Sequence, residues 1–281
     1  MLFRRQEREE FPYQYPSHLR DLAAELPRAP GVYQFHGEEQ SVPLYIGKSV
    51  DLRTRVLSHL REPGEARMLS QTRRITHVRT AGDLGAQLLE AHQIKTLQPL
   101  YNKKLRRTHR ICSIALDLGG VRYAFSNEPN FRIRTNLYGL FGSKMAAMER
   151  LRALAEEHEL CYARIGLERT PGGRPCFRHS IGRCRGVCAG KEAGRDHDER
   201  LLTALRGIEV AKWPYKGRVA IEERDGKLRQ LHVIDHWNYL GSAGSLREAR
   251  RIKGDSGQFD RDDYYIMARP MLSGELRVRE L

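Results

Sequence analysis

Residues 31–47, GVYQFHGEEQSVPLYIG, contain the two short segments on which the predicted fold rests. The segments 31–36 and 43–47 are rich in Val, Tyr, Phe and Ile, which is typical of strands, and a polar loop joins them. A loop of this length allows several pairings, so the register of the two strands stays open. Tyr33 and Tyr45 lie on these strands, where a tyrosine usually belongs to the core.

Helix and strand signals continue on the C-terminal side of this pair. Ser49 or Asp51 can cap a helix that runs to about Arg61, a strand follows at 73–80, and Asp83 caps a helix that Pro99 ends. Before the pair lies an N-terminal extension, 1–27, with a short helix. With 281 residues the chain is long enough for more than one domain.

The remainder of the chain divides by composition into three parts. Residues 107–160 contain a connecting strand, ICSIALDL, and a helix with apolar residues at helical spacing. Residues 161–195 are rich in Cys, Gly and Arg. Residues 196–281 contain one helix and several strands with a turn at Asp225-Gly226, which predicts a small α+β C-terminal domain.

Positive charge is concentrated in two segments. The formal net charge of the chain is +14; residues 44–110 contribute +9, residues 161–191 contribute +6, and the rest contributes −1. Clustered cationic charge suits a polyanion because each phosphate contact releases condensed counterions. Charge alone does not separate DNA from RNA or an acidic membrane, and a solvated basic surface is the alternative interpretation. The chain has neither a membrane-length apolar run nor an apolar signal segment, so we expect a cytoplasmic protein.

Three side chains in the N-terminal third suit phosphodiester chemistry. Glu90 falls among apolar residues of its helix, where a carboxylate is costly unless it is paired or bound to a metal such as Mg²⁺. Arg55 and His59 are one helical turn apart; arginine can hold a phosphate, and histidine can transfer a proton near neutral pH. An Arg-paired Glu90 at a helix edge and an ordinary solvated face for the other two remain the alternatives.

In order and spacing, these residues resemble the GIY-YIG nuclease superfamily. GVY at 31–33 and YIG at 45–47 correspond to its two tripeptides, and Lys48, Arg55, His59, Glu90 and Asn102 follow in order. The resemblance implies a nuclease domain over 28–106, a three-stranded antiparallel sheet flanked by helices, within an α+β chain. It also implies that all seven residues of the set, Tyr33 and Tyr45 included, are catalytic.

The family mechanism gives each of these side chains a role. Glu90 is the single protein ligand of Mg²⁺ or Mn²⁺, and Arg55 binds charge that develops on phosphorus. Tyr33 is the best candidate to accept a proton from the attacking water, with Tyr45, Lys48 and His59 assisting. Asn102 holds the site or the DNA backbone. Excinuclease C proteins usually carry Tyr in place of His59, so the exact role of His59 stays open.

Four cysteines lie close together in the sequence, at Cys161, Cys176, Cys184 and Cys188. A metal site is favoured over disulfides in a cytosolic protein, and by chemistry alone Zn²⁺ and an iron–sulfur cluster are about equally suited. Cys112 lies alone in an apolar strand. The segment is similar to the region after the nuclease domain of bacterial excinuclease C, which implies a structural [4Fe–4S] cluster on these four thiolates.

The similarity to excinuclease C covers roughly residues 25–195, yet those proteins continue for several hundred residues more. It implies a shorter homologue, a monomer of the bacterial cytoplasm and nucleoid, that cuts damaged double-stranded DNA 3′ to a lesion marked by UvrB, which UvrA loads. The basic side chains expected to contact DNA are Lys48, Arg53, Arg73, Arg74, Lys103, Lys104, Arg106, Arg107, Arg174, Arg178, Arg183 and Arg185. A stand-alone restriction or mobile-element endonuclease on the same scaffold, or a non-enzymatic iron–sulfur protein that binds nucleic acid, are the alternatives.

Overall fold

The computed structural model describes residues 13–38, 42–106, 110–254 and 258–281, and the chain forms two compact units. The first unit combines the N-terminal part, through residue 108, with residues 217–255 and 262–281. The second unit combines residues 109–216 with 256–261. The C-terminal part of the chain therefore folds back onto the N-terminal domain.

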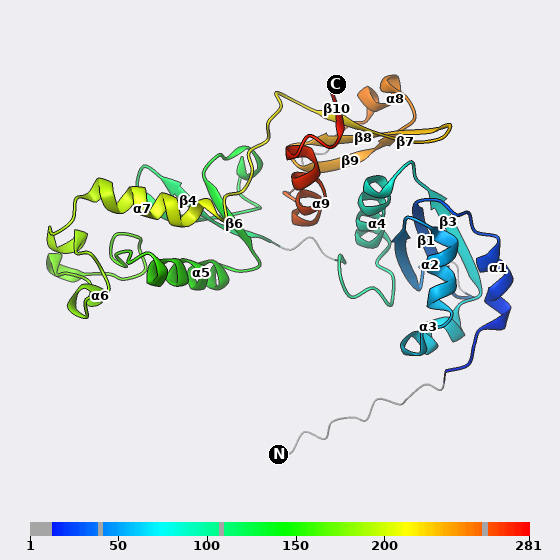
Figure 1. Ribbon diagram of the computed structural model, residues 1–281, viewed down its shortest axis with the longest axis horizontal. Coiled ribbons are helices and arrows are strands. Elements are labelled where there is room, and N and C mark those ends of the chain that lie inside the picture. The colour runs from blue at the N-terminus through cyan, green and yellow to red at the C-terminus, as the bar shows by residue number, and fades with distance from the viewer. Residues whose placement is uncertain (1–12, 39–41, 107–109, 255–257) are drawn as a thin grey trace, which may run out of the picture. The chain divides into compact units, whose positions relative to one another are not determined.

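The N-terminal domain is built on a three-stranded antiparallel sheet in the order β2-β1-β3 (Figure 1). Its strands are β1 (Gly31–His36), β2 (Tyr45–Ser49) and β3 (Arg74–Arg79). The register left open by the sequence pairs Tyr33 with Gly47 on β2 and with His77 on β3. This sheet and its flanking helices confirm the predicted fold class of the domain.

Helices cover both faces of this sheet. One face, with Tyr33 and Phe35, packs against the helices α1 (Arg20–Ala24), α2 (Leu52–His59) and α3 (Ala66–Gln71). The other face packs Val32 and Ile46 against Ile94 of α4 (Asp83–Leu97). The alternation of side chains along a strand explains why neighbouring residues of β1 serve two separate cores.

The two helix starts predicted from sequence have different outcomes. Asp51 is the N-cap of α2, and its Oδ1 accepts a hydrogen bond from the Thr54 N–H at 2.9 Å. The prediction that Asp83 caps α4 is wrong: Asp83 is the first helical residue, and the N-cap position is Gly82, which has no side chain to offer.

The second unit contains another three-stranded antiparallel sheet, in the order β5-β4-β6. Its strands are β4 (Cys112–Asp117), β5 (Gly120–Phe125) and β6 (Leu137–Phe141). The helices α5 (Lys144–Glu157) and α7 (Gly194–Arg206) share the core with this sheet, and the cysteine-rich segment, with α6 (Phe177–Ser180), lies between them in the sequence. The sequence-based boundary at residue 196 assigned α7 to the C-terminal domain, whereas α7 packs in the second unit.

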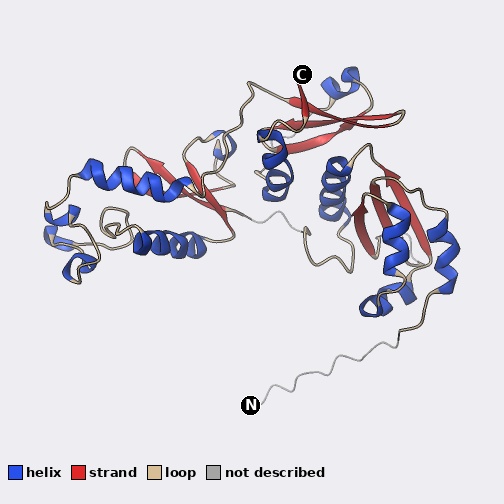
Figure 2. Cartoon of the chain, viewed as in Figure 1, coloured by secondary structure: helices blue, strands red, loops and turns tan. Residues whose placement is uncertain are grey.

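The C-terminal part forms a four-stranded antiparallel sheet in the order β10-β7-β8-β9. Figure 2 draws the strands of the protein in red. The strands are β7 (Val219–Asp225), β8 (Leu228–Asp235), β9 (Asn238–Ala243) and β10 (Arg277–Glu280), and the helices are α8 (Leu246–Arg251) and α9 (Arg261–Leu272). The expected turn at Asp225-Gly226 joins β7 to β8, and Gly226 there has a positive φ of 58°.

Short 3₁₀ turns complete the described chain, at Ser17–Leu19, Pro63–Glu65, Phe131–Ile133, Pro171–Gly173 and Val187–Ala189. None of the described helices has the length and the apolar character that a membrane crossing requires.

Candidate active site

Three aromatic side chains of the predicted catalytic set form one cluster. Tyr33 of β1, Tyr45 of β2 and His59 of α2 have ring centroids 5.4 to 6.2 Å apart. The Tyr33 hydroxyl and His59 Nε2 share a hydrogen bond of 2.5 Å, and both side chains are buried. Gly47 makes room for this arrangement, because a Cβ there would lie 2.3 Å from the Tyr33 hydroxyl oxygen.

A carboxylate absent from the sequence prediction completes this cluster. Glu65 Oε2 lies 2.5 Å from His59 Nδ1. A neutral histidine that donates from Nδ1 to a carboxylate keeps Nε2 as an acceptor, and in that form of His59 the phenol of Tyr33 donates to Nε2. The result is a hydrogen-bonded chain from Tyr33 through His59 to Glu65. No sequence motif indicated Glu65. It lies in the 3₁₀ turn Pro63–Glu65, which follows α2 in the chain.

The environment keeps the hydroxyl of Tyr33 protonated. Burial, followed by the neighbouring Tyr45, raises the pKa of Tyr33 well above its ordinary value, and the positive charge of Arg55 only partly opposes this rise. A phenolate is therefore not the resting form of Tyr33. Any role of Tyr33 as a proton acceptor requires that its own proton is passed on, and His59 Nε2 is the group in hydrogen-bond contact with it.

Glu90 has the surroundings expected of a cation ligand. Its Oε1 accepts a hydrogen bond from the Lys48 backbone N–H at 3.1 Å, and no ion pair is found for Glu90 among the described residues. Burial raises the pKa of Glu90, and the Lys48 N–H opposes this rise. A half-buried carboxylate whose second oxygen is not bonded to a side-chain cation fits a hard divalent ion that completes its shell with water and phosphate.

Three members of the predicted catalytic set remain. Arg55 is exposed, whereas the side chains of Lys48 and Asn102 are hydrogen-bonded to other residues of the domain. Arg55 is exposed on α2, so its guanidinium is accessible to a phosphate. The Lys48 ammonium binds both carboxylate oxygens of Asp83, at 2.8 and 3.1 Å. Asn102 brackets the backbone of Ile46: Oδ1 accepts from its N–H at 2.9 Å, and Nδ2 donates to its carbonyl at 2.8 Å. Asn102 thus holds β2 in place.

The basic residues predicted to contact DNA in this domain differ in how exposed they are and in whether they already bind another group of the domain. Exposed side chains are those of Arg73, Arg74, Lys103 and Lys104, whereas Arg106 is half-buried. The Arg53 Nε donates to the Leu26 carbonyl at 2.7 Å, so part of this guanidinium is used within the domain. Arg107 lies outside the described residues.

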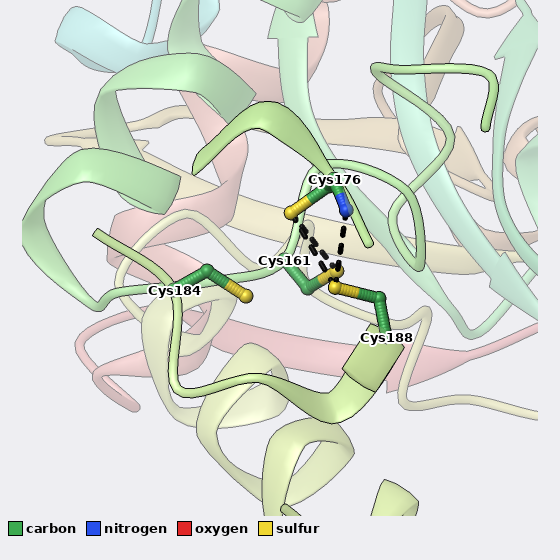
Figure 3. A group of neighbouring side chains, drawn as sticks. All are labelled: Cys161, Cys176, Cys184 and Cys188. Carbon is green, nitrogen blue, oxygen red and sulfur yellow. Dashed lines mark hydrogen bonds between the residues drawn. The ribbon is translucent and has the colours of Figure 1, made fainter. Parts of the chain in front are cut away.

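The four cysteines of the second unit converge on one point (Figure 3). Their Sγ atoms all lie within 4.8 Å of one another, and Cys176 Sγ is 3.7 Å from Cys161 Sγ and 3.5 Å from Cys188 Sγ. The Cys188 Sγ accepts from the Cys176 N–H at 3.3 Å, and the Cys184 Sγ accepts from the Gly186 N–H at 3.3 Å. Cys112 lies apart from them on β4, buried in the core.

This spacing suits metal binding but does not decide the metal. Four thiolates around a single tetrahedral ion at about 2.3 Å lie roughly 3.8 Å apart. In a [4Fe–4S] cluster each thiolate binds a different iron, so the sulfurs lie farther apart than around a single ion. The four cysteines thus form a preformed, largely buried sulfur site that can hold a metal ion or, with some outward movement, a cluster.

The arginines near the cysteine site are not equally available to DNA. Arg178 is buried; it pairs with Glu156 and donates to the carbonyls of Ala155 and Arg183, so its charge is used inside the unit. Arg178 is therefore not available to contact DNA, unlike the other arginines predicted to do so in this unit. Arg174 is exposed. Arg183 and Arg185 are also exposed, with surface ion pairs to Glu156 at 3.5 Å and Glu159 at 2.8 Å, respectively.

Comparisons with known families cover most of the chain. The UvrC-like GIY-YIG domain matches residues 29–103, the UvrC/Cho excinuclease middle domain matches 111–207, and the excinuclease Cho C-terminal domain matches 218–281. These ranges separate the nuclease domain, the second unit and the C-terminal sheet in the same order as the structure.

Individual relatives agree with this result. Excinuclease Cho of Escherichia coli (strain K12) is 46% identical over 96% of this chain and 91% of its own length. The excinuclease Cho of Salmonella typhi is 45% identical over 96% of this chain and 92% of its own. The UvrABC system protein C of Xanthomonas campestris pv. campestris (strain B100) is 30% identical over 85% of this chain, but only 39% of its own length.

Among solved structures, the GIY-YIG N-terminal endonuclease domain of UvrC from Thermotoga maritima, bound to magnesium as its catalytic divalent cation, is similar to part of this chain. It is 30% identical over 31% of this chain and 97% of its own, with a TM-score of 0.28.

Proposed function

The chain belongs to the excinuclease Cho family of GIY-YIG endonucleases, and from this premise we propose that it cuts damaged double-stranded DNA on the 3′ side of a lesion. The observation that carries the proposal is the convergence of Glu90, Arg55 and the Tyr33–His59–Glu65 chain in one site. UvrB, loaded by UvrA, is the proposed partner that marks the lesion, and the bacterial cytoplasm is the proposed location.

Glu90 is the proposed ligand of Mg²⁺ or Mn²⁺. A divalent ion bound there supplies Lewis-acid stabilisation of the departing 3′ oxygen. Arg55 supports the same transition state from the side of α2, because its exposed guanidinium can donate two hydrogen bonds to the phosphate. Asn102 and Asp83 act indirectly, through β2. Asn102 binds the backbone of Ile46, and Asp83 binds the ammonium of Lys48, whose backbone N–H donates to Glu90.

The hydrogen-bonded chain supplies a route for the proton of the attacking water. Tyr33 accepts that proton at its hydroxyl oxygen as it passes its own proton to His59 Nε2. The imidazolium that forms is stabilised by Glu65, which lies 2.5 Å from Nδ1. The water oxygen forms the new bond to phosphorus and the 3′ oxygen leaves, so no free phenolate is required despite the raised pKa of Tyr33.

Basic side chains of both units are the proposed DNA contacts, because phosphate contacts position a duplex without reading its sequence. In the nuclease domain the set is Lys48, Arg53, Arg73, Arg74, Lys103, Lys104 and Arg106, with Arg107 from outside the described residues, and in the second unit it is Arg174, Arg183 and Arg185. Arg183 and Arg185 can exchange their exposed carboxylate partners for phosphate at little cost.

We propose that the four cysteines hold a [4Fe–4S] cluster with a structural role, and Zn²⁺ is the alternative. The burial of three of the cysteines and the N–H donors to their sulfurs support either metal. Anaerobic purification followed by visible absorbance and by iron and zinc analysis distinguishes the two. Iron with inorganic sulfide supports the cluster, whereas stoichiometric zinc without iron replaces it by a single ion.

A reconstituted incision assay tests the repair function. Duplex DNA with one defined lesion is incubated with the protein, a divalent metal, and either both UvrA and UvrB or neither, and the cut sites are mapped. We expect a cut 3′ to the lesion that depends on UvrB. Cutting of undamaged DNA at a fixed sequence without partners would instead support a stand-alone endonuclease, and the absence of cutting under every condition would support a non-enzymatic binding protein.

A further inference from the structure

The first turn of α4, the helix that carries Glu90, is capped from the opposite end of the chain. The backbone N–H groups of Leu84 and Gly85 donate to Glu223 Oε1 at 3.1 Å and Oε2 at 2.8 Å, respectively. Glu223 belongs to β7 of the C-terminal sheet. Because Gly82 at the N-cap offers no side chain, this remote carboxylate satisfies N–H groups that a helix cannot satisfy itself. Its negative charge also complements the helix dipole.

The capping carboxylate is itself held by a chain of hydrogen bonds within the C-terminal sheet. His232 Nε2 lies 2.9 Å from Glu223 Oε2, and His232 Nδ1 lies 2.7 Å from the Ser242 hydroxyl, which lies 2.6 Å from the Tyr239 hydroxyl. His232 is buried. Each member therefore has a defined partner, and Glu223 has little freedom to turn away from α4.

Two glycines at the start of α4, Gly82 and Gly85, leave room for this cap. A Cβ at Gly82 would lie 2.1 Å from Glu223 Oε1, and a Cβ at Gly85 would lie 2.6 Å from His232 Cε1. Neither glycine needs an unusual backbone conformation, since neither has a positive φ. Close approach of the C-terminal sheet is thus a reason for glycine at both positions.

Further contacts continue along the same side of the helix. The Ala81 N–H donates to Gln230 Oε1 at 2.7 Å, the rings of His92 and Tyr239 meet at 6.3 Å, and Lys95 pairs with Asp262 of α9 at 3.0 Å. At 100° per residue, Glu90 lies about 140° around the helix from Gly85. The C-terminal domain therefore contacts one side of α4, and Glu90 lies on the other side, where its Oε1 accepts from the Lys48 N–H of β2.

We propose that the C-terminal domain is a positioning element of the nuclease site, in which Glu223, supported by His232, fixes α4 and thereby Glu90. The inference rests on the proposed role of Glu90 as the metal ligand. Neither Glu223 nor His232 contacts the reacting atoms in this scheme; each acts through the helix. Hydrogen bonds that fix the surroundings of a metal ligand set the orientation of that ligand and so its affinity for metal.

Hydrogen exchange of the full-length protein, without metal or DNA, tests the cap directly. In Glu223→Ala the amides of Leu84 and Gly85 lose their acceptor, and we expect the peptide over 81–95 to exchange about tenfold faster at these sites. Glu223→Gln keeps one acceptor oxygen and should give an intermediate rate. Unchanged exchange in Glu223→Ala overturns the cap, whatever the activity.

Metal titration of nicking tests the link from the cap to Glu90. For Glu223→Ala we expect about tenfold more Mn²⁺ at half-maximal rate, with unchanged affinity for DNA and with partial rescue in Glu223→Gln. Faster exchange with an unchanged metal requirement overturns the positioning role and leaves the cap purely structural. Nicking by the wild type that survives Glu90→Gln contradicts the proposed metal ligand, and the exchange result on the cap still stands.

A double-mutant cycle identifies the contact responsible. Gly82→Ala alone should raise the metal requirement, because its Cβ collides with Glu223, and the Gly82→Ala/Glu223→Ala pair should do less harm than the two effects combined. Gly64→Ala is the matched control, since its Cβ meets nothing closer than 3.4 Å. Full additivity, or an equal effect of Gly64→Ala, contradicts the proposed contact.

Discussion

Gly47 determines where the Tyr33 hydroxyl can lie, because any Cβ at this position would occupy the same space. The glycine of the second tripeptide is thus explained by the tyrosine of the first, which pairs with it across β1 and β2. The hydroxyl that fits there donates to His59, and His59 in turn is held by Glu65. At the residue scale the proposed proton route therefore begins at Tyr33.

The role of Glu65 can be tested by Glu65→Gln. An amide in place of the carboxylate cannot stabilise the imidazolium, so we expect the single-turnover cleavage rate to fall at least about tenfold. DNA affinity should not change, because the exchange leaves the surface of the domain nearly the same. Glu62→Gln in the same turn is the control. Equal rates for the wild type and Glu65→Gln would remove Glu65 from the proton route.

Glu222 of β7 is a second residue whose charge depends on its neighbours. It pairs with Arg224 at 2.5 Å and with Arg229 and Arg279 at 3.1 Å, and Arg229 followed by Arg224 lowers its pKa to about 2. Because the folded pKa is below the ordinary value of about 4.3, this contribution to stability is present above about pH 4.3. It is lost as the pH falls from there toward 2.

Glu222→Gln should therefore lower the free energy of unfolding by about 2 kcal/mol at pH 7 and by about half as much at pH 3. Urea denaturation at the two pH values measures this difference. Glu280→Gln, a change of an exposed carboxylate on the neighbouring strand β10, should have little effect at either pH. A loss for Glu222→Gln that is the same at pH 3 and pH 7 would contradict the charge-based explanation.

At the scale of elements, the position of β2 depends on Asn102. Its side-chain amide replaces a neighbouring strand for Ile46, with one bond donated and one accepted. Asn102→Ala leaves both backbone groups of Ile46 without this partner, so we expect a loss of about 2 kcal/mol in stability and reduced cleavage. Chemical denaturation and the incision assay measure the two effects. Full stability in Asn102→Ala would show that water replaces the amide.

Elements whose signals are local could be predicted from the sequence. The strands around Tyr33 and Tyr45, the helix capped by Asp51 and the helix that carries Glu90 all have periodicity or caps within a few residues. Their antiparallel order came from the family resemblance, and the structure confirms it.

Features set by distant parts of the chain could not be predicted in this way. The cap of α4 comes from Glu223, about 140 residues away, so the sequence around Asp83 suggested the wrong residue. Glu65 becomes part of the site only because the turn after α2 returns toward His59. Arg178 is buried and pairs with Glu156 of α5, a partner that no local pattern indicates.

At the scale of the whole molecule, the chain is not folded in its linear order. The nuclease domain and the C-terminal sheet share one unit, whereas the cysteine site belongs to the other. Loss of the metal proposed for the cysteine site should therefore act mainly on the second unit, because the binding energy of a structural metal is folding energy of the region that holds it.

We expect Cys184→Ser to lose the bound metal and to make the second unit unfold at lower temperature, with little change in hydrogen exchange of the first unit. Metal analysis and exchange measured along the chain check both parts. Cys112→Ala, a change at a buried thiol apart from the site, should retain the metal. Equal metal content in Cys184→Ser and the wild type would exclude Cys184 as a ligand.

Glu90, the proposed metal ligand, is a residue of α4 in the unit that contains the nuclease domain. Glu90→Gln removes the charge but keeps the size and the acceptor for the Lys48 N–H. The direct measurement is cleavage of lesion-bearing duplex, with UvrA, UvrB and a divalent metal, by the wild type and by Glu90→Gln at equal DNA occupancy. We expect cleavage 3′ to the lesion by the wild type and a loss of at least about a thousandfold in the variant. Cleavage by Glu90→Gln at the wild-type rate would contradict the metal-dependent mechanism.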